Sequence, residues 1–202
     1  MNFSAVILAG GKSSRMGQDK AWLQIDGESL LARQIRLARE VGAGEVLISG
    51  RMDTNYSTLG CQVLHDRFVD AGPLAGIECA LAMTLSSLLL VLAVDMPKIN
   101  AQLLRQLLSQ CSESAGVIPR VKSRIEPLAA FYPRLAGNLI GDYFSASRQA
   151  EFGNETSYVN AKLPSMTTFA ERCVTGGLAR FADLSENEAH LFVNWNSPAQ
   201  VE

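Results

Sequence analysis

The feature that most constrains the fold is a set of short apolar runs that are continuous and do not alternate with polar residues. Four such runs have strand length and are separated by helix-like segments: Ala5 to Leu8, Glu45 to Ser49, Cys61 to His65 and Leu88 to Val94. Continuous apolar character is typical of strands covered on both faces, as in the parallel sheet of an α/β domain. The pattern therefore predicts a three-layer α/β fold with a mostly parallel sheet.

Helix-like segments lie between these runs. Ser29 to Val41 carries apolar residues near helical spacing, with arginines elsewhere and Gly42 as a stop signal. Leu74 to Met83 and Ala101 to Cys111 are predicted as two further helices, the second with Asn100 as its N-cap. Because strand–helix–strand crossovers are almost always right-handed, the loops after the strands should gather at one edge of the sheet.

The second half of the chain is less regular. It predicts strands in GVIP (116–119) and PLAAFY (127–132), a helix over Arg134 to Phe144 and an irregular segment over Glu151 to Met166. With 202 residues, 48% of them hydrophobic, the chain is long enough to bury a core, and no stretch has linker composition. We expect residues 1–202 to form one domain, in which the second half supplies the other wall of a cleft.

Composition argues against several classes of protein. A net charge of −2 and a pI near 5.8 provide no basic field for nucleic-acid backbones. The N-terminus has no basic region before its short apolar run, and the longest apolar stretch is too short to span a bilayer. We therefore expect a cytoplasmic protein with no membrane or nucleic-acid partner.

Cysteine and histidine usage argues against a zinc site. The two histidines are isolated, and the cysteines are far apart with no C-x-x-C pair: Cys61, Cys79, Cys111 and Cys173. We expect the thiols to be reduced and mostly buried.

A loop rich in glycine and positive charge, LAGGKSSRMGQDK (residues 8–20), follows the first apolar run. It is not a Walker A loop, because the first glycine of that motif would fall on Val6, inside the strand. It is not a dinucleotide fingerprint either, because the next glycine after Gly11 is Gly17. The kind of ligand must therefore come from the remaining residues.

The loop nevertheless suits a polyphosphate. Gly10 and Gly11 allow backbone N–H groups to approach an anion closely, while Lys12, Arg15 and Lys20 can neutralise its charge. A glycine turn with solvated surface charges would explain each residue separately. It does not explain why so many donors stand at the carboxyl end of a parallel strand.

Two further positions carry polar groups suited to ligands. Asp95 ends the most hydrophobic strand, where a carboxylate can hold Mg²⁺ together with phosphate oxygens, although an Asp that begins a turn before Pro97 is common. Asn194 and Asn196 alternate in FVNWNSP, so both amides would lie on one face of an extended segment. Turn-forming asparagines before Pro198 are the alternative explanation.

Four stretches together carry a family resemblance: LAGGKSSRMGQDK (8–20), DRFVDAGPLAG (66–76), LLLVLAVDMP (88–97) and FVNWNSP (192–198). The chain resembles nucleotidyltransferases with a GT-A-like Rossmann-type fold. More closely, it is similar to the molybdenum cofactor guanylyltransferases, which join GMP from GTP to molybdopterin. The resemblance implies a Rossmann-like nucleotidyltransferase domain, with a nucleotide-binding half over about 1–115 and an acceptor-binding half over about 116–202.

The resemblance also implies roles for individual residues. Asp95 would hold the metal, taken to be Mg²⁺, and would act in catalysis together with Arg15 and Lys20. Asn194 and Asn196 would contact molybdopterin. The nucleotide would contact Leu8, Ala9, Gly10, Gly11, Lys20, Ser49, Asp66, Gly76 and Asp95.

Some positions bear on specificity. Leu8, Ala9 and Gly10, together with the PLAG motif, favour GTP over CTP in the resembling family. Ser49 stands where the family commonly has an Asn that contacts the nucleotide, and Glu126 stands where another residue is frequent.

The resemblance implies GTP and molybdopterin as substrates, with molybdoenzymes or their chaperones as further partners. The alternatives are a cytidylyltransferase or sugar-phosphate nucleotidyltransferase of the same fold, and a catalytically silent nucleotide-binding partner in molybdoenzyme maturation.

Overall fold

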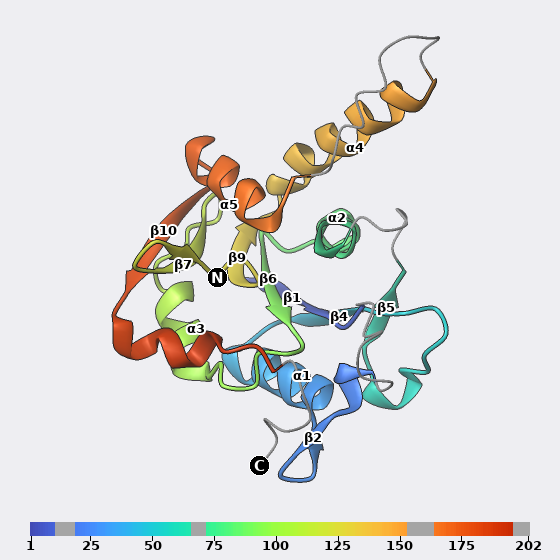
Figure 1. The fold of residues 1–202 in the computed structure, drawn as a ribbon, viewed down its shortest axis with the longest axis vertical. Coiled ribbons are helices and arrows are strands. Elements are labelled where there is room, and N and C mark those ends of the chain that lie inside the picture. The colour runs from blue at the N-terminus through green and yellow to red at the C-terminus, as the bar shows by residue number, and fades with distance from the viewer. Residues whose placement is uncertain (11–18, 66–71, 153–163, 196–202) are drawn as a thin grey trace.

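A computed structural model describes residues 1–10, 19–65, 72–152 and 164–195 of the chain. Within these ranges one large sheet has the strand order β10-β7-β9-β6-β1-β4-β5, and β8 pairs with β7 beside it (Figure 1). The strands are β1 (Phe3–Leu8), β4 (Glu45–Ser49), β5 (Gln62–Leu64), β6 (Leu88–Ala93), β7 (Gly116–Val121), β8 (Arg124–Ile125), β9 (Ala129–Pro133) and β10 (Ala179–Leu184). A small hairpin of β2 (Gln24–Ile25) and β3 (Glu28–Ser29) lies outside it.

The centre of the sheet is parallel, as the continuous apolar runs predicted. β1 pairs in parallel with both β4 and β6, and Leu8 lies opposite Ser49 on one side and Ala93 on the other. β1 and β6 are buried along their whole length. The three carboxyl ends therefore meet at one edge of the sheet, immediately before the residues predicted to bind nucleotide and metal.

The other half of the sheet is mixed, which the sequence did not predict. β9 runs antiparallel to both β6 and β7, while β10 runs parallel to β7. The strands predicted at 116–119 and 127–132 correspond to β7 and β9. β9 thus joins the second half of the chain directly to β6 and brings it beside the central strands.

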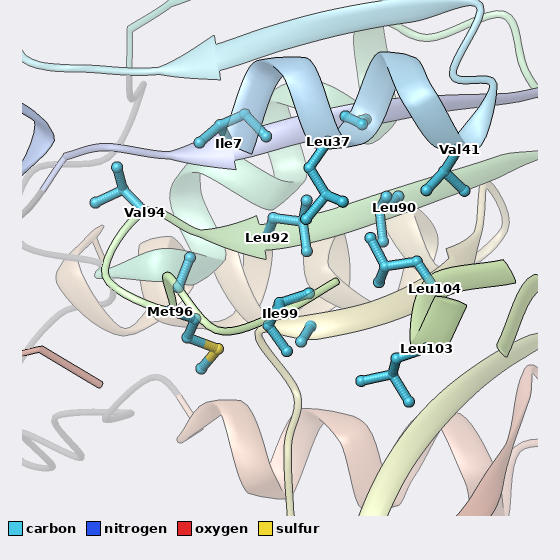
Figure 2. Packing of buried hydrophobic residues seen from close by; sticks show 14 of the residues in the cluster. Ile7, Leu37, Val41, Leu90, Leu92, Val94, Met96, Ile99, Leu103 and Leu104 are labelled. Atoms are coloured by element: carbon cyan, nitrogen blue, oxygen red, sulfur yellow. The ribbon is translucent and has the colours of Figure 1, made fainter. Parts of the chain in front are cut away.

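Helices cover both faces of the sheet and give the predicted three layers (Figure 1). One core contains Phe3, Ala5 and Ile7 of β1 packed with α1 and α3; the other contains Val6 and Leu8 packed with α2, α4 and α5. Figure 2 shows Leu37 of α1 and Leu103 of α3 in the first core. The helices are α1 (Leu30–Val41), α2 (Pro73–Met83), α3 (Ala101–Leu108), α4 (Ala136–Phe152) and α5 (Met166–Thr175).

The first helix and its stop at Gly42 were predicted correctly, whereas Ser29, predicted inside the helix, is its N-cap. The Ser29 hydroxyl accepts a hydrogen bond from Ala32 N at 3.2 Å, and Gly42 ends α1 with φ 102°, a left-handed conformation that suits glycine. Asn100 caps α3 by accepting from Leu103 N at 2.9 Å. That helix ends at Leu108 and not at Cys111 as predicted.

Other predictions of elements need correction. α4 continues to Phe152, eight residues past the predicted end at Phe144, since neither glycine nor proline follows Gly141 before that point. The predicted irregular segment therefore begins inside α4, while residues 153–163 lie outside the described ranges. α5, β10 and the short helix η3 (Glu186–Phe192) were not predicted.

The four cysteines are all free thiols; Cys79 and Cys173 are buried, and burial raises the pKa of Cys173 to about 12. In the described ranges, no helix combines the length and the apolar character needed to cross a membrane.

Candidate active site

Asp95 lies just beyond the carboxyl end of β6, beside the end of β1. Val94 N donates a hydrogen bond to Leu8 O at 3.2 Å, so the segments that follow β1 and β6 stay in contact past the last paired residues. The Asp95 side chain is only 20% exposed. The sheet thus delivers one carboxylate to its carboxyl edge, as the sequence predicted.

Lys20 is the cation nearest this carboxylate among the described residues. Its Nζ lies 3.0 Å from Asp95 Oδ2, and its side chain is 22% exposed. A short 3₁₀-helix, η1 (Lys20–Trp22), carries it, and Asp19 caps this helix by accepting from Ala21 N at 3.1 Å. The local turn therefore aims the ammonium group at the end of β6.

The site fits a divalent cation by its donor chemistry. A carboxylate oxygen is a hard ligand, and Mg²⁺ is commonly held by one or two carboxylates plus phosphate oxygens and water. Lys20 engages Asp95 Oδ2, and no described residue donates a hydrogen bond to Oδ1. The described residues contain no cluster of three or more His, Cys, Asp or Glu that could hold a metal. Asp95 would therefore need ligand oxygens to complete a coordination shell.

The first glycine of the loop is held against β4. Ala9 N and Gly10 N both donate to Ser49 O, at 2.8 and 2.9 Å. The β1–β4 contact therefore continues two residues past β1 and occupies both N–H groups. The amide of Gly10 is directed at β4 in this structure, so the anion-binding amides expected of this loop would have to come from later residues.

Ser49 is packed beneath the start of α2. It is 4% exposed, and a Cβ added at Gly76 would lie 2.2 Å from Ser49 Oγ and 2.7 Å from Ser49 Cβ. The same Cβ would approach Leu8 Cδ2 at 3.2 Å. Glycine at position 76 is thus what lets α2 approach the ends of β1 and β4. The fold brings Leu8, Ser49 and Gly76 together, with the Ser49 side chain almost fully buried.

The C-terminal motif reaches the same edge of the sheet. Trp195 N donates a hydrogen bond to Asp95 O at 2.8 Å, and the neighbouring Asn194 is exposed. On the other side of Asn194, Arg124 Nη2 donates to Phe192 O at 3.3 Å. Asn194 is the residue predicted to bind the acceptor, and Asp95 is the predicted metal ligand. Asn194 directly precedes Trp195, whose N–H is bonded to the Asp95 carbonyl, so the two predicted residues are held near each other.

Glu126 lies behind this segment. Its side chain is 7% exposed and pairs with Arg124, whose own side chain is 63% exposed. Burial raises the pKa of the Glu126 carboxyl above its ordinary value, and the Arg124 hydrogen bond opposes that shift only in part. Glu126 therefore supports the arginine that holds Phe192.

The fold gathers the described members of the predicted site at one edge of the sheet: Leu8, Ala9, Gly10, Lys20, Ser49, Gly76, Asp95 and Asn194. Four predicted residues lie outside the described ranges: Gly11, Arg15, Asp66 and Asn196. The contact of Trp195 with Asp95 was not predicted. Every residue except proline has a backbone N–H, so the sequence carried no signal for this hydrogen bond.

The chain is similar to known proteins over nearly its whole length. A protein of Opitutus terrae named "Probable molybdenum cofactor guanylyltransferase" is 37% identical over 198 residues, which cover 96% of this chain and 91% of that protein.

Two solved structures share the fold. Molybdopterin-guanine dinucleotide biosynthesis protein A from Archaeoglobus fulgidus has a TM-score of 0.67 and 19% identity, covering 98% of this chain and 94% of the other. The 4-diphosphocytidyl-2C-methyl-D-erythritolsynthase of Anaerococcus prevotii has a TM-score of 0.70 and 12% identity, covering 99% and 92%. At these identities the two similarities show the fold alone.

Residues 5–152 match the family described as a MobA-like NTP transferase domain. This match spans most of the chain, and the Opitutus terrae relative extends the similarity to nearly all of it. The chain belongs to the MobA-like NTP transferase family.

Proposed function

We propose that this protein transfers GMP from GTP to molybdopterin in the cytoplasm and releases pyrophosphate. The observation that carries the proposal is the Lys20–Asp95 pair at the carboxyl edge of the sheet, joined to the C-terminal motif by the Trp195–Asp95 hydrogen bond. A cation, a metal-binding carboxylate and an exposed amide thus stand along one edge. Such an edge suits a nucleotide and an acceptor lying side by side.

The chemistry needs no protein nucleophile. An oxygen of the acceptor's terminal phosphate attacks the α-phosphorus of GTP, a new P–O bond forms, and the bond to the β-phosphate oxygen breaks. Asp95 would hold Mg²⁺, which supplies charge neutralisation at the phosphates when it is bound. Lys20 and Arg15 would neutralise the negative charge that develops on the α-phosphate and on the departing pyrophosphate.

In this proposal one domain binds both substrates, with GTP on residues of the first half and molybdopterin on Asn194 and Asn196. Leu8, Ala9, Gly10, Gly11, Asp66 and Gly76 would form the nucleotide side. Ser49 would contribute by fixing the end of β4, because its hydroxyl lies under α2 and its carbonyl holds Ala9 and Gly10. Product delivery to molybdoenzymes or their chaperones would follow.

Two alternatives remain distinct hypotheses. A cytidylyltransferase or sugar-phosphate nucleotidyltransferase would use the same fold, which the Anaerococcus prevotii 4-diphosphocytidyl-2C-methyl-D-erythritolsynthase shares. A catalytically silent nucleotide-binding partner is suggested by Ser49 in place of the family's Asn. The Lys20–Asp95 pair supports an active enzyme over the silent partner, since a cation beside a carboxylate that can hold a metal is what nucleotidyl transfer requires.

The test is incubation of the protein with molybdopterin, Mg²⁺ and each of GTP, CTP, ATP and UTP in turn. We expect pyrophosphate release and a guanine dinucleotide product, identified by mass, with GTP alone. Product with CTP in preference to GTP would establish the cytidylyltransferase alternative. Failure with every nucleotide would favour the silent partner, and full activity of Asp95→Ala would contradict the metal assignment.

A further inference from the structure

The turn that carries Asp95 is held by three hydrogen bonds to three consecutive carbonyls. The carbonyls of residues 95–97 accept, in order, from Trp195 N at 2.8 Å, Gln34 Nε2 at 2.8 Å and Arg33 Nε at 3.0 Å. Two of the three donors are neighbouring side chains of α1. This helix therefore donates two hydrogen bonds to the turn immediately after the predicted metal ligand.

Side-chain packing also anchors this turn. Val94 and Met96, which flank Asp95, are 7% and 3% exposed and belong to the core between the sheet and α1 (Figure 2). With both neighbours buried and three carbonyls bonded, the backbone at Asp95 has little freedom. Lys20 then fixes the carboxylate itself through Oδ2.

Gln34 is an unexpected residue at its position. It is 1% exposed, and the other buried positions of α1 are apolar. Its Oε1 is buried without a hydrogen-bond partner among the described residues, and burying such a group unpaired costs stability. An apolar residue would serve the core better, so stability does not explain this amide. What Gln34 supplies is the donor to Met96 O.

We propose that Gln34 and Arg33 are positioning residues that hold Asp95 for metal-assisted nucleotide binding. The inference rests on the proposed function, because it assumes that Asp95 holds the metal of a metal–nucleotide complex. It adds that α1, which carries none of the sequence motifs, sets the geometry of this ligand. Partners that orient a metal ligand from behind typically change metal affinity about 10- to 100-fold when removed.

The test measures how much a metal tightens nucleotide binding, with Mn²⁺ as the probe and the full-length protein. GTP is titrated with saturating Mn²⁺ and again with a chelator, and the ratio of the two dissociation constants reports the metal's contribution. For Gln34→Met, which keeps length but removes the donor, we expect this ratio to fall about tenfold. Binding with chelator and the unfolding midpoint should stay close to wild type.

Matched variants separate positioning from folding. Gln106→Met, at an exposed position of α3, should leave the ratio unchanged. Arg33→Met should lower the ratio of dissociation constants by a smaller factor. Arg33→Lys keeps a donor, so its ratio should stay closer to that of the wild type. If Gln34→Met failed to fold, the Arg33 pair alone would decide the question.

The two levels of proposal fail differently. A folded Gln34→Met with a wild-type ratio, or an Arg33→Met indistinguishable from Arg33→Lys, would overturn the positioning role and leave the proposed function intact. If Mn²⁺ did not change the affinity of the wild-type protein for GTP, the metal role of Asp95 would be overturned, and with it the role of α1.

Discussion

Lys20 Nζ and Asp95 Oδ2 lie 3.0 Å apart although 75 positions separate the two residues in the sequence. Both side chains are about four-fifths buried, so solvent screens this pair less than an ion pair at the surface. The pair therefore keeps a cation beside the carboxylate that is predicted to bind a metal. In the proposed function, Lys20 would stand beside the phosphates whose negative charge it neutralises.

Removing either charge should abolish most of the activity. For Lys20→Met and Asp95→Asn we expect kcat/KM to fall about 10²- to 10³-fold, because each change removes a fixed charge that acts on the transition state. The measurement is pyrophosphate release with GTP and molybdopterin. Lys122→Met provides the control, since Lys122 forms a surface pair with Glu186 in which both side chains are more than 60% exposed. A Lys20→Met enzyme as active as this control would refute the role of Lys20.

Gly76 should not tolerate even one methyl group. In Gly76→Ala the new Cβ would lie 2.7 Å from Ser49 Cβ, which the backbone of β4 holds in place. We expect the free energy of unfolding to fall by about 1–3 kcal/mol, the usual cost of overpacking a core. Urea unfolding at constant pH measures this change.

A second substitution tests the cause of that loss. Ser49→Gly removes both the Oγ and the Cβ that the new methyl group would meet. In the Ser49→Gly background, Gly76→Ala should therefore cost much less than in wild type, and the two changes should be non-additive. An equal cost in both backgrounds would mean that α2 is displaced by something other than Ser49.

Glu126 should make stability depend on pH. Its pKa is raised from its ordinary value of 4.5, so the folded chain binds the proton more tightly than the unfolded chain. That stabilisation is complete below about 4.5 and is lost as the pH rises through the folded-state pKa. Glu126→Gln resembles the protonated acid at every pH, so its free energy of unfolding relative to wild type should increase as the pH rises.

Urea unfolding of both proteins at several pH values above and below 4.5 measures this difference. Arg124 interacts favourably with the ionised carboxylate and so opposes this trend, but burial outweighs it, because the pKa of Glu126 is raised with Arg124 in place. A difference that stays flat or falls with increasing pH would show that Arg124 outweighs burial at Glu126.

The parallel centre of the fold could be predicted because burial on both faces leaves a direct mark on sequence. β1 and β6 are wholly apolar, or nearly so, and nothing else explains such runs in a chain without membrane-length segments. Strand direction leaves no such mark, which is why antiparallel β9 was not distinguished. β10 was missed because it is an edge strand in which exposed Arg180 and Asp183 interrupt the apolar residues.

Site residues that directly follow a strand could be located from the sequence. Contacts that come from a distant part of the chain could not. The location of Asp95 and Gly10 could be predicted because carboxyl ends of parallel strands meet at one edge, while their roles stay predictions. Gln34 looks like an ordinary polar residue of a helix, and its contact with Met96, 62 positions away, exists only in the folded chain. The Ser49 side chain was expected at the nucleotide, and its burial under Gly76 depends on how closely α2 approaches.

Replacing Asn194 should weaken binding of the acceptor and leave binding of the nucleotide unchanged. Its amide is exposed one residue from Trp195, whose N–H is bonded to Asp95 O, so the segment is held in place whether or not the amide is present. We expect Asn194→Ala to raise the KM for molybdopterin about tenfold, the loss of one amide hydrogen bond, with the KM for GTP unchanged. Steady-state kinetics with each substrate varied in turn would measure both, with Asn138→Ala on the exposed side of α4 as the control. A rise in the KM for GTP alone would assign Asn194 to the nucleotide and contradict its assignment to the acceptor.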